Sequence, residues 1–254
     1  MYSFSHGTEN FTRPPIVLIH GAGGMHLHWP PQARYLSGQR VYAPDLPGHG
    51  RSPAKASETS IAGYARAVVD FLDDLELPPA IIVGHSMGGA VALHLALDTP
   101  ERVLGLCLVA SGAKLGVDPA LLNGIAHADS IPATLRRLNE LEFGPDVNPR
   151  MKELALQRMR DIDPQVLHAD YLACDSFDVR ARLGEINIPT QIFCGTHDLL
   201  TPIHYSEYLR ERISGAELVP FARAGHMLML EQPEMFTNAL EEFANTLRIK
   251  KQVA

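Results

Sequence analysis

Residues 80–98 read AIIVGHSMGGAVALHLALD, and three kinds of local structure follow one another within them. The β-branched run at 80–83 predicts a buried strand, and the run AVALHLALD at 90–98 predicts a helix. Between them stands Gly84-His85-Ser86-Met87-Gly88, a G-x-S-x-G motif. Glycine on both sides of the serine lets neighbouring backbone segments approach closely, as a very tight turn requires. The sequence therefore predicts a strand–turn–helix unit with Ser86 at the apex of its turn.

Further short apolar runs on both sides of this unit predict the other strands of a sheet. They lie at 15–20, 40–43, 104–110, 190–195 and 217–221. Their apolar character is nearly continuous, which is typical of strands covered on both faces. Helical spacing of apolar residues separates several of them, as after Ser60, a predicted N-cap, and after Pro233. This alternation predicts an α/β fold with a doubly wound, mostly parallel sheet.

The range 112–187 interrupts the alternation, because it contains no convincing strand pattern. Asn148–Pro149 and Asp163–Pro164 each resemble an N-cap followed by proline at the first helical position. We therefore predict one domain, 1–254, with a helical cap or lid at 112–187 inserted between two strands. The cap is expected over the carboxyl edge of the sheet, where ligands bind in open α/β folds.

Composition narrows the class of protein. The 254 residues are 46% hydrophobic and carry a formal net charge of −7, which suits a globular domain and gives no reason to expect nucleic-acid binding. Cys107, Cys174 and Cys194 are too few for a disulfide framework, and 1–14 has no apolar core of a secretory signal. A cytoplasmic protein without a membrane span is expected. Monomer and homodimer stay open.

Ser86 is the predicted nucleophile. The tight turn projects its hydroxyl over the sheet edge, and the helix that follows directs N–H groups at the same place, where negative charge would develop. The alternative is a glycine-rich turn in which the serine is incidental. A serine hydroxyl is a weak nucleophile without a neighbouring base, so a suitable histidine further along the chain favours the catalytic interpretation.

His226 is the predicted general base. It stands in Ala224-Gly225-His226-Met227, between the last predicted strand and the last predicted helix, and this loop leaves the same sheet edge as Ser86. His197 and His204 are the nearest rivals. His85 lies too close to the turn to bend back on Ser86.

Asp198 is the carboxylate expected to orient His226 and to stabilise the imidazolium. It follows the strand at 190–195, so the chain order is Ser, Asp, His. A rival acid would follow the strand that ends at Ala110, but no carboxylate occurs there before Asp118. The alternative role for Asp198 is that of a simple loop or N-cap aspartate.

Backbone N–H groups are expected to hold the oxyanion that forms when a carbonyl is attacked. Met87, directly after the nucleophile, is predicted to supply one. Ala22, in the small-residue loop HGAGG at 20–24, is predicted to supply the other, with Gly23 as second choice. Gly23, His85 and Met227 are also predicted to line the substrate pocket.

These motifs together resemble the α/β-hydrolase fold superfamily, in its capped serine esterase and lipase-like branch. The resemblance rests on HGAGG, DLPGHGRS at 45–52, GHSMGG, GTHDLLTP at 195–202 and AGHMLMLEQP at 224–233. It implies a mostly parallel sheet with a helical cap, no cofactor, and hydrolysis through a covalent acyl-enzyme. A serine nucleophile argues against haloalkane dehalogenase and epoxide hydrolase chemistry. The short segment before Ile16 implies that the usual leading hairpin is abbreviated.

The expected activity is hydrolysis of carboxylic esters of small to medium, largely apolar acyl groups, with a small-molecule ester as substrate. A carbon–carbon bond (diketone) hydrolase, a lactonase, a thioesterase, an acyltransferase and a perhydrolase would use the same three residues. Outside enzymes, the alternative is a ligand receptor on a hydrolase scaffold. Intact Ser86, Asp198 and His226 argue against that alternative.

Several other polar residues are expected to stabilise loops rather than to take part in chemistry. His26 and His28 have metal-ligand spacing but no third ligand nearby, so a structural or substrate-loop role is expected and no metal. Asp45, Arg51 and Ser52 are expected to stabilise a surface loop. Some apolar cap residues are expected to face substrate, the candidates being Leu115, Leu121, Leu122, Leu138, Leu141 and Phe143.

Overall fold

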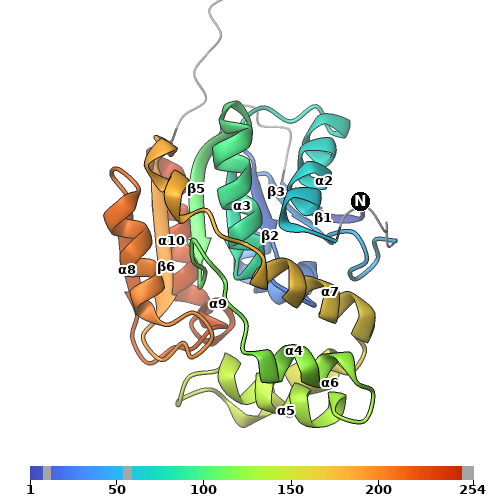
Figure 1. The fold of residues 1–254 in the computed structure, drawn as a ribbon. Coiled ribbons are helices and arrows are strands. Elements are labelled where there is room, and N and C mark those ends of the chain that lie inside the picture. Colours follow the sequence, from blue (N-terminus) through green and yellow to red (C-terminus); the bar gives the residue numbers. More distant parts are fainter. Residues whose placement is uncertain (8–12, 54–58, 248–254) are drawn as a thin grey trace, which may run out of the picture.

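The computed structural model describes residues 1–7, 13–53 and 59–247, which form a seven-stranded sheet in the order β1-β3-β2-β4-β5-β6-β7 (Figure 1). Neighbouring strands from β3 to β7 pair in parallel, and β1 pairs antiparallel with β3. The predicted doubly wound, mostly parallel α/β sheet is confirmed. Its strands are β1 (Ser3–His6), β2 (Ile16–Ile19), β3 (Val41–Pro44), β4 (Ala80–His85), β5 (Val103–Val109), β6 (Thr190–Gly195) and β7 (Glu217–Phe221).

Among the strands, β1 is the one that the sequence analysis does not predict. Its residues Ser-Phe-Ser-His lie at the edge of the sheet and are mostly half-buried, so they lack the continuous apolar pattern of the central strands. The strand pairs with β3 rather than forming a hairpin with its neighbour in sequence. Residues 8–12 of the same segment, and 248–254 of the predicted domain, lie outside the described residues.

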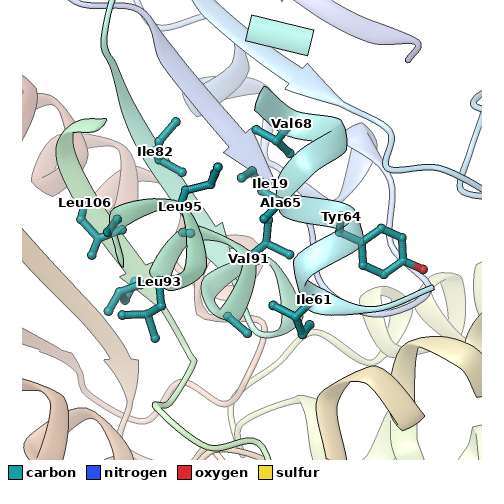
Figure 2. Close-up of a cluster of buried hydrophobic side chains, with 14 of the residues drawn as sticks. Ile19, Ile61, Tyr64, Ala65, Val68, Ile82, Val91, Leu93, Leu95 and Leu106 are labelled. Atoms are coloured by element: carbon teal, nitrogen blue, oxygen red, sulfur yellow. The ribbon is translucent and has the colours of Figure 1, made fainter. Parts of the chain in front are cut away.

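Helices cover both faces of the sheet. One face carries α2 (Ile61–Asp74), α3 (Met87–Asp98) and α8 (Ile203–Arg212). Figure 2 shows how side chains of α2 and α3, among them Val68 and Val91, pack with Ile19 and Ile82 of the sheet. Ser60 caps α2 as predicted, since its side chain accepts a hydrogen bond from the N–H of Gly63.

The opposite face carries α1 (Pro31–Arg34), α9 (Leu228–Glu231) and α10 (Pro233–Thr246). Its core contains aromatic pairs: Trp29 stacks on Phe236 with ring centroids 5.8 Å apart, and Phe193 and Phe221 pack edge to face at 5.9 Å. Within the described ranges, none of the helices combines the length and the apolar character needed to cross a bilayer.

Between β5 and β6 the chain forms α4 (Pro119–Ala126), α5 (Ile131–Glu142), α6 (Pro149–Met159), α7 (Pro164–Asp175) and the 3-10 helix η4 (Arg180–Glu185). The side chains of Asn148 and Asp163 cap α6 and α7, which confirms the predicted starts of these helices. In Figure 1, α4, α5 and α6 lie together at one end, and α7 lies nearer the sheet. Leucine and isoleucine side chains of α4, α5 and α7 form a small core there. That 112–187 acts as a lid stays a prediction.

Asp45 connects the loops at one end of β2 and β3. Its Oδ1 accepts a hydrogen bond from the backbone N–H of His26 at 2.7 Å and lies 2.8 Å from His26 Nδ1, and its Oδ2 accepts from the N–H of Arg51 at 2.9 Å. The stabilising role predicted for Asp45 is confirmed, but the carboxylate is fully buried rather than at the surface. His26 therefore has a structural role, and in the described part of the chain no three potential ligand side chains group around a metal position.

Candidate active site

Ser86 lies at the apex of the turn between β4 and α3, as predicted. Its backbone angles, φ 53° and ψ −117°, lie in a region that residues other than glycine rarely adopt. A Cβ at Gly84 would overlap the carbonyl oxygen of Gly88, and a Cβ at Gly88 would overlap that of Ile19. The turn therefore closes only with glycine at both positions. The side chain of Ser111 adds a hydrogen bond to the carbonyl oxygen of Ser86, at 2.8 Å.

His226 and Asp198 meet from two loops at the carboxyl ends of β6 and β7. Nδ1 of His226 lies 2.8 Å from Oδ2 of Asp198, across 28 positions of sequence. Because the carboxylate accepts a hydrogen bond from the Nδ1–H of His226, Nε2 is left as the basic nitrogen. The rivals His197 and His204 are both exposed. The structure thus brings together the two side chains that the sequence analysis predicts as base and orienting acid.

Thr201 completes the environment of Asp198 and is absent from the sequence analysis. Its hydroxyl donates to Oδ2 of Asp198 at 2.7 Å, while the N–H groups of Leu200 and Thr201 donate to Oδ1 at 2.8 and 2.9 Å. Asp198 is buried and so loses hydrogen bonds to water, and these three donors replace them. The only sequence signal was the threonine three residues after the aspartate, a common loop pattern.

The pKa values of the pair shift in opposite directions. Burial lowers the pKa of His226, but the charge and the hydrogen bond of Asp198 outweigh burial and raise it. Burial opposes the ionised form of Asp198, yet the charge of His226 and the surrounding donors hold the pKa of Asp198 below its ordinary value. Both shifts show that the site favours an imidazolium beside a carboxylate, which is the state reached when His226 accepts a proton.

Ser86 and His226 line one cavity of about 310 Å³, together with Ala22, His85 and Met227. A second cavity of about 370 Å³ adjoins it and is lined mainly by apolar side chains of the cap and by Gly23. Each of the three predicted pocket residues therefore borders at least one of the cavities, and Met227 borders both. His28 borders both, and burial, followed by the charge of Arg158, lowers the pKa of His28 to about 4.

Of the six apolar cap residues expected to face substrate, four line a cavity. Leu115, Leu121 and Leu141 line the cavity of Ser86, and Leu138 lines the second one. Phe143 instead packs in the core beside the sheet, and Leu122 is not among the lining residues of either cavity.

His85 supports the loop of His226. Burial lowers the pKa of His85 well below its ordinary value, so the ring is neutral. Its Nε2–H donates to the carbonyl oxygen of His226 at 3.1 Å, and the two rings lie 4.8 Å apart between centroids. His85 therefore has a positioning contact in addition to its place in the cavity wall.

In the loop at 20–24, hydrogen bonds with neighbouring side chains engage the Gly21 carbonyl oxygen and the Gly23 N–H, and the Ala22 N–H points away from His20. The N–H of Leu46 donates to Nε2 of His20 at 3.0 Å, so Nδ1 of His20 carries a proton and donates to the carbonyl oxygen of Gly21 at 2.8 Å. In a trans peptide the C=O and the next N–H point in opposite directions, so the Ala22 N–H is directed away from His20. The Gly23 N–H is engaged by Asp170 at 2.7 Å. Of the two candidates, the geometry favours Ala22 as the free donor.

Met87 is the first residue of α3, where a backbone N–H has no acceptor within the helix. Ala22 borders the same cavity as Ser86. The cavity is thus bordered by a hydroxyl, a basic ring nitrogen and the residue of the Ala22 N–H, and the Met87 N–H directly follows Ser86 in the chain, which is a set that acyl transfer can use.

Glu142 is a further ionisable group at this site that the sequence analysis overlooks. It ends α5 and borders both cavities. Burial raises the pKa of Glu142 from 4.5 to about 7; the nearby His226 lowers it and Asp198 raises it. A carboxylate among leucines at the end of the 131–142 helix was the available signal.

Comparisons with known proteins find relatives of the same fold. The family model described as the alpha/beta hydrolase fold matches residues 14–233. The chain is 32% identical over 243 residues to a pimeloyl-[acyl-carrier protein] methyl ester esterase of Neisseria meningitidis serogroup B, covering 90% of this chain and 92% of the relative. It is 29% identical to 3-oxoadipate enol-lactonase 1 of Acinetobacter baylyi, covering 96% and 92%. The crystal structure of the enol-lactonase of Burkholderia xenovorans LB400 superposes with a TM-score of 0.87 at 26% identity, covering 96% of each chain.

Proposed function

The chain belongs to the α/β hydrolase fold family, and we propose that it is a serine hydrolase that cleaves carboxylic esters of small to medium, largely apolar acyl groups. One observation carries this proposal: Ser86 and His226 face the same cavity while His226 is hydrogen-bonded to Asp198. Similarity to hydrolases supports the reaction class, and the assignment of residues rests on the geometry.

The proposed reaction proceeds through an acyl-enzyme. Oγ of Ser86 attacks the ester carbonyl carbon while Nε2 of His226 accepts its proton. The N–H groups of Ala22 and Met87 hold the oxyanion, and losing one such donor costs about 3–4 kcal/mol in comparable enzymes. His226 then protonates the leaving alcohol, and a water molecule activated by the same ring hydrolyses the acyl-enzyme.

The paired cavities support an apolar acyl group. Pockets of this size suit small molecules, and the second cavity offers apolar side chains to an acyl chain that extends beyond Ser86. Helices α4, α5, α6 and α7 supply much of the lining, which is why we propose that 112–187 serves as a lid.

Lactone hydrolysis is a second candidate, favoured by the similarity to two enol-lactonases. It follows the same steps, except that the leaving alcohol stays attached to the acyl group. A lactone series measured beside open-chain esters separates the two candidates by the ratio of their kcat/KM values.

A fluorophosphonate probe, followed by peptide mass mapping, tests the nucleophile. We expect labelling at Ser86 and turnover of a p-nitrophenyl ester series, with both lost in Ser86→Ala. Ser60→Ala is the matched control, since this serine caps α2 away from the cavity and should leave both intact. Ester hydrolysis retained by Ser86→Ala would refute the assignment. Turnover far below about 1 s⁻¹ on every ester, with tight binding, would favour a receptor.

A further inference from the structure

Asp170 is a fully buried carboxylate on the cap helix α7 that receives donors from three distant segments. Its Oδ2 accepts from the backbone N–H of Gly23 at 2.7 Å and from Nε2 of His49 at 2.7 Å. Its Oδ1 accepts from the hydroxyl of Tyr64, on α2, at 2.6 Å. The cap is thereby joined to the loop of Ala22, to the 45–52 loop and to a helix that packs on the sheet.

His49 supplies the charge that this buried carboxylate needs. Nδ1 of His49 lies 3.0 Å from the carbonyl oxygen of Pro47, and Nε2 faces Asp170, so acceptors face both ring nitrogens. Acceptors at both ring nitrogens favour a ring that carries both protons, an imidazolium. Burial lowers the pKa of His49, but the hydrogen bond and the charge of Asp170 outweigh burial and raise it. A buried ion pair with further donors is costly to break by removing one partner.

The contact to Gly23 bears directly on Ala22, because the peptide groups on both sides of Ala22 are held. The preceding peptide is held through the Gly21 carbonyl oxygen, which accepts from His20 and from the N–H of Gly24 at 3.0 Å. The following peptide is held through the Gly23 N–H, whose acceptor belongs to the cap. Gly23 has φ +60°, and Leu167 and Ile162 of the cap segment lie against it.

We propose that Asp170 is a positioning residue for the oxyanion hole: the cap carboxylate holds the Ala22–Gly23 peptide and so directs the Ala22 N–H toward the carbonyl oxygen of the substrate. This inference rests on the proposed function. Stabilisation of the transition state then depends on the seating of the cap, which gives the cap a part in turnover beyond enclosing the substrate.

The variant Asp170→Asn keeps the size of the side chain but replaces one carboxylate oxygen by an NH₂ group, which cannot accept a hydrogen bond. Either the Tyr64 hydroxyl or the Gly23 N–H and His49 then lose their acceptor. We expect kcat to fall about 10–100-fold, less than the full loss of an oxyanion donor, while KM changes by less than about threefold. A side chain that only stabilises the cap would not produce this separation of kcat from KM.

An alkyl trifluoromethyl ketone reports on the oxyanion hole directly. Oγ of Ser86 bonds to the carbonyl carbon, its proton passes to His226, and the electron pair of the C=O bond stays on the oxygen that occupies the hole. We expect the inhibition constant to rise in Asp170→Asn by the same factor by which kcat/KM falls, as transition-state analogues should.

The matched control is Asp163→Ala. Asp163 caps the same helix α7 by accepting from the N–H of Gln165 at 2.8 Å, and its side chain is exposed. This variant should lower the melting temperature without changing kcat or ketone affinity. If Asp170→Asn does not fold, Tyr64→Phe takes its place, since it removes one donor to Asp170, and a kcat loss of about 3–10-fold with unchanged KM is expected.

Folded Asp170→Asn or Tyr64→Phe with wild-type kcat and wild-type ketone affinity would overturn the inference while leaving the proposed function intact. An equal loss of kcat in Asp163→Ala would also overturn it, because helix stability alone would then explain the effect. A wild-type protein that is inert to both esters and the ketone would refute the proposed function, and this inference with it.

Discussion

The backbone N–H of Met227 donates a hydrogen bond to the backbone carbonyl oxygen of Glu142 at 3.0 Å. Glu142 is the last residue of α5, and Met227 directly follows His226, so the cap contacts the loop of the proposed base. The carboxylate of Glu231 makes a second connection, since it accepts from the N–H groups of Gly144 and Gly225 at 2.9 Å each. The cap is thus bonded directly to Met227 and, through the Glu231 carboxylate, to Gly225, the two neighbours of His226 in the chain.

Replacing Glu142 by glutamine should shift the pH profile. The negative charge of Glu142 contributes to raising the pKa of His226, after burial and the interactions with Asp198. Its removal lowers that pKa, so the acidic limb of kcat/KM should move to lower pH. The measurement is kcat/KM for one ester across the pH range. Glu140→Gln, an exposed neighbour on α5, is the control, and an unmoved acidic limb would contradict the prediction.

The same variant should change stability in a pH-dependent direction. Burial raises the pKa of Glu142 from 4.5 to about 7, so the folded protein binds this proton more tightly than the unfolded chain does. The stabilisation is present below the unfolded pKa and is lost as pH rises through about 7. Glu142→Gln should therefore melt a few degrees higher than wild type near pH ~9 and no higher near pH ~4, since 1 kcal/mol corresponds to roughly 2–4 °C.

Asp198→Asn should lower kcat by about 10⁴-fold, the loss seen when an amide replaces the orienting carboxylate in a comparable triad. The amide no longer fixes the proton on Nδ1 of His226 and no longer stabilises the imidazolium. Thr201→Val, which removes one donor to Asp198, should cost far less. Steady-state kinetics on one ester checks both, and equal effects of the two variants would show that Asp198 has no special role.

Gly88→Ala should prevent the turn at Ser86 from closing, because its Cβ would overlap the carbonyl oxygens of Ile19 and His20. We expect destabilisation by about 4 kcal/mol or more, or failure to fold. Thermal unfolding and soluble yield are the measurements. Gly184→Ala is the control, since open space surrounds a Cβ there, and similar melting temperatures for the two variants would be inconsistent with the strained turn.

Ala155→Trp should shorten the preferred acyl chain. Ala155 lies on α6 and lines the second cavity, so an indole there would occupy space that we assign to the distal part of the acyl group. The ratio of kcat/KM for octanoate to that for acetate p-nitrophenyl esters should fall at least about tenfold, since each buried methylene contributes about 0.8 kcal/mol. An unchanged ratio would place the acyl chain elsewhere.

Local features of this protein followed from the sequence because they depend on neighbours only a few residues away. Strand β4, the turn at Ser86 and the caps at Ser60, Asn148 and Asp163 are set by apolar runs, by the missing Cβ of glycine and by short side-chain hydrogen bonds. The mostly parallel direction of the strands followed as well, since parallel strands require crossover helices between them, and the sequence displays that alternation.

Strand β1, by contrast, acquires its structure from pairing with β3, and no apolar pattern marks an edge strand of this kind. Thr201 and Glu142 are not predicted either, since a threonine in a loop and a glutamate on a helix are ordinary surface residues. Only the folded structure places Thr201 beside Asp198 and Glu142 beside both cavities. Their place beside the proposed site depends on how distant segments of the chain pack together, which no local pattern predicts.

The sequence alone determined the fold family and the candidates Ser86, Asp198 and His226, since each stands directly after a predicted strand of one sheet. Only the tertiary structure decided which N–H of the 20–24 loop is free and that Asp170 holds its neighbour, because that contact spans 147 positions. Hydrogen bonds over such separations depend on how the cap packs against the sheet domain, and no local pattern encodes that packing.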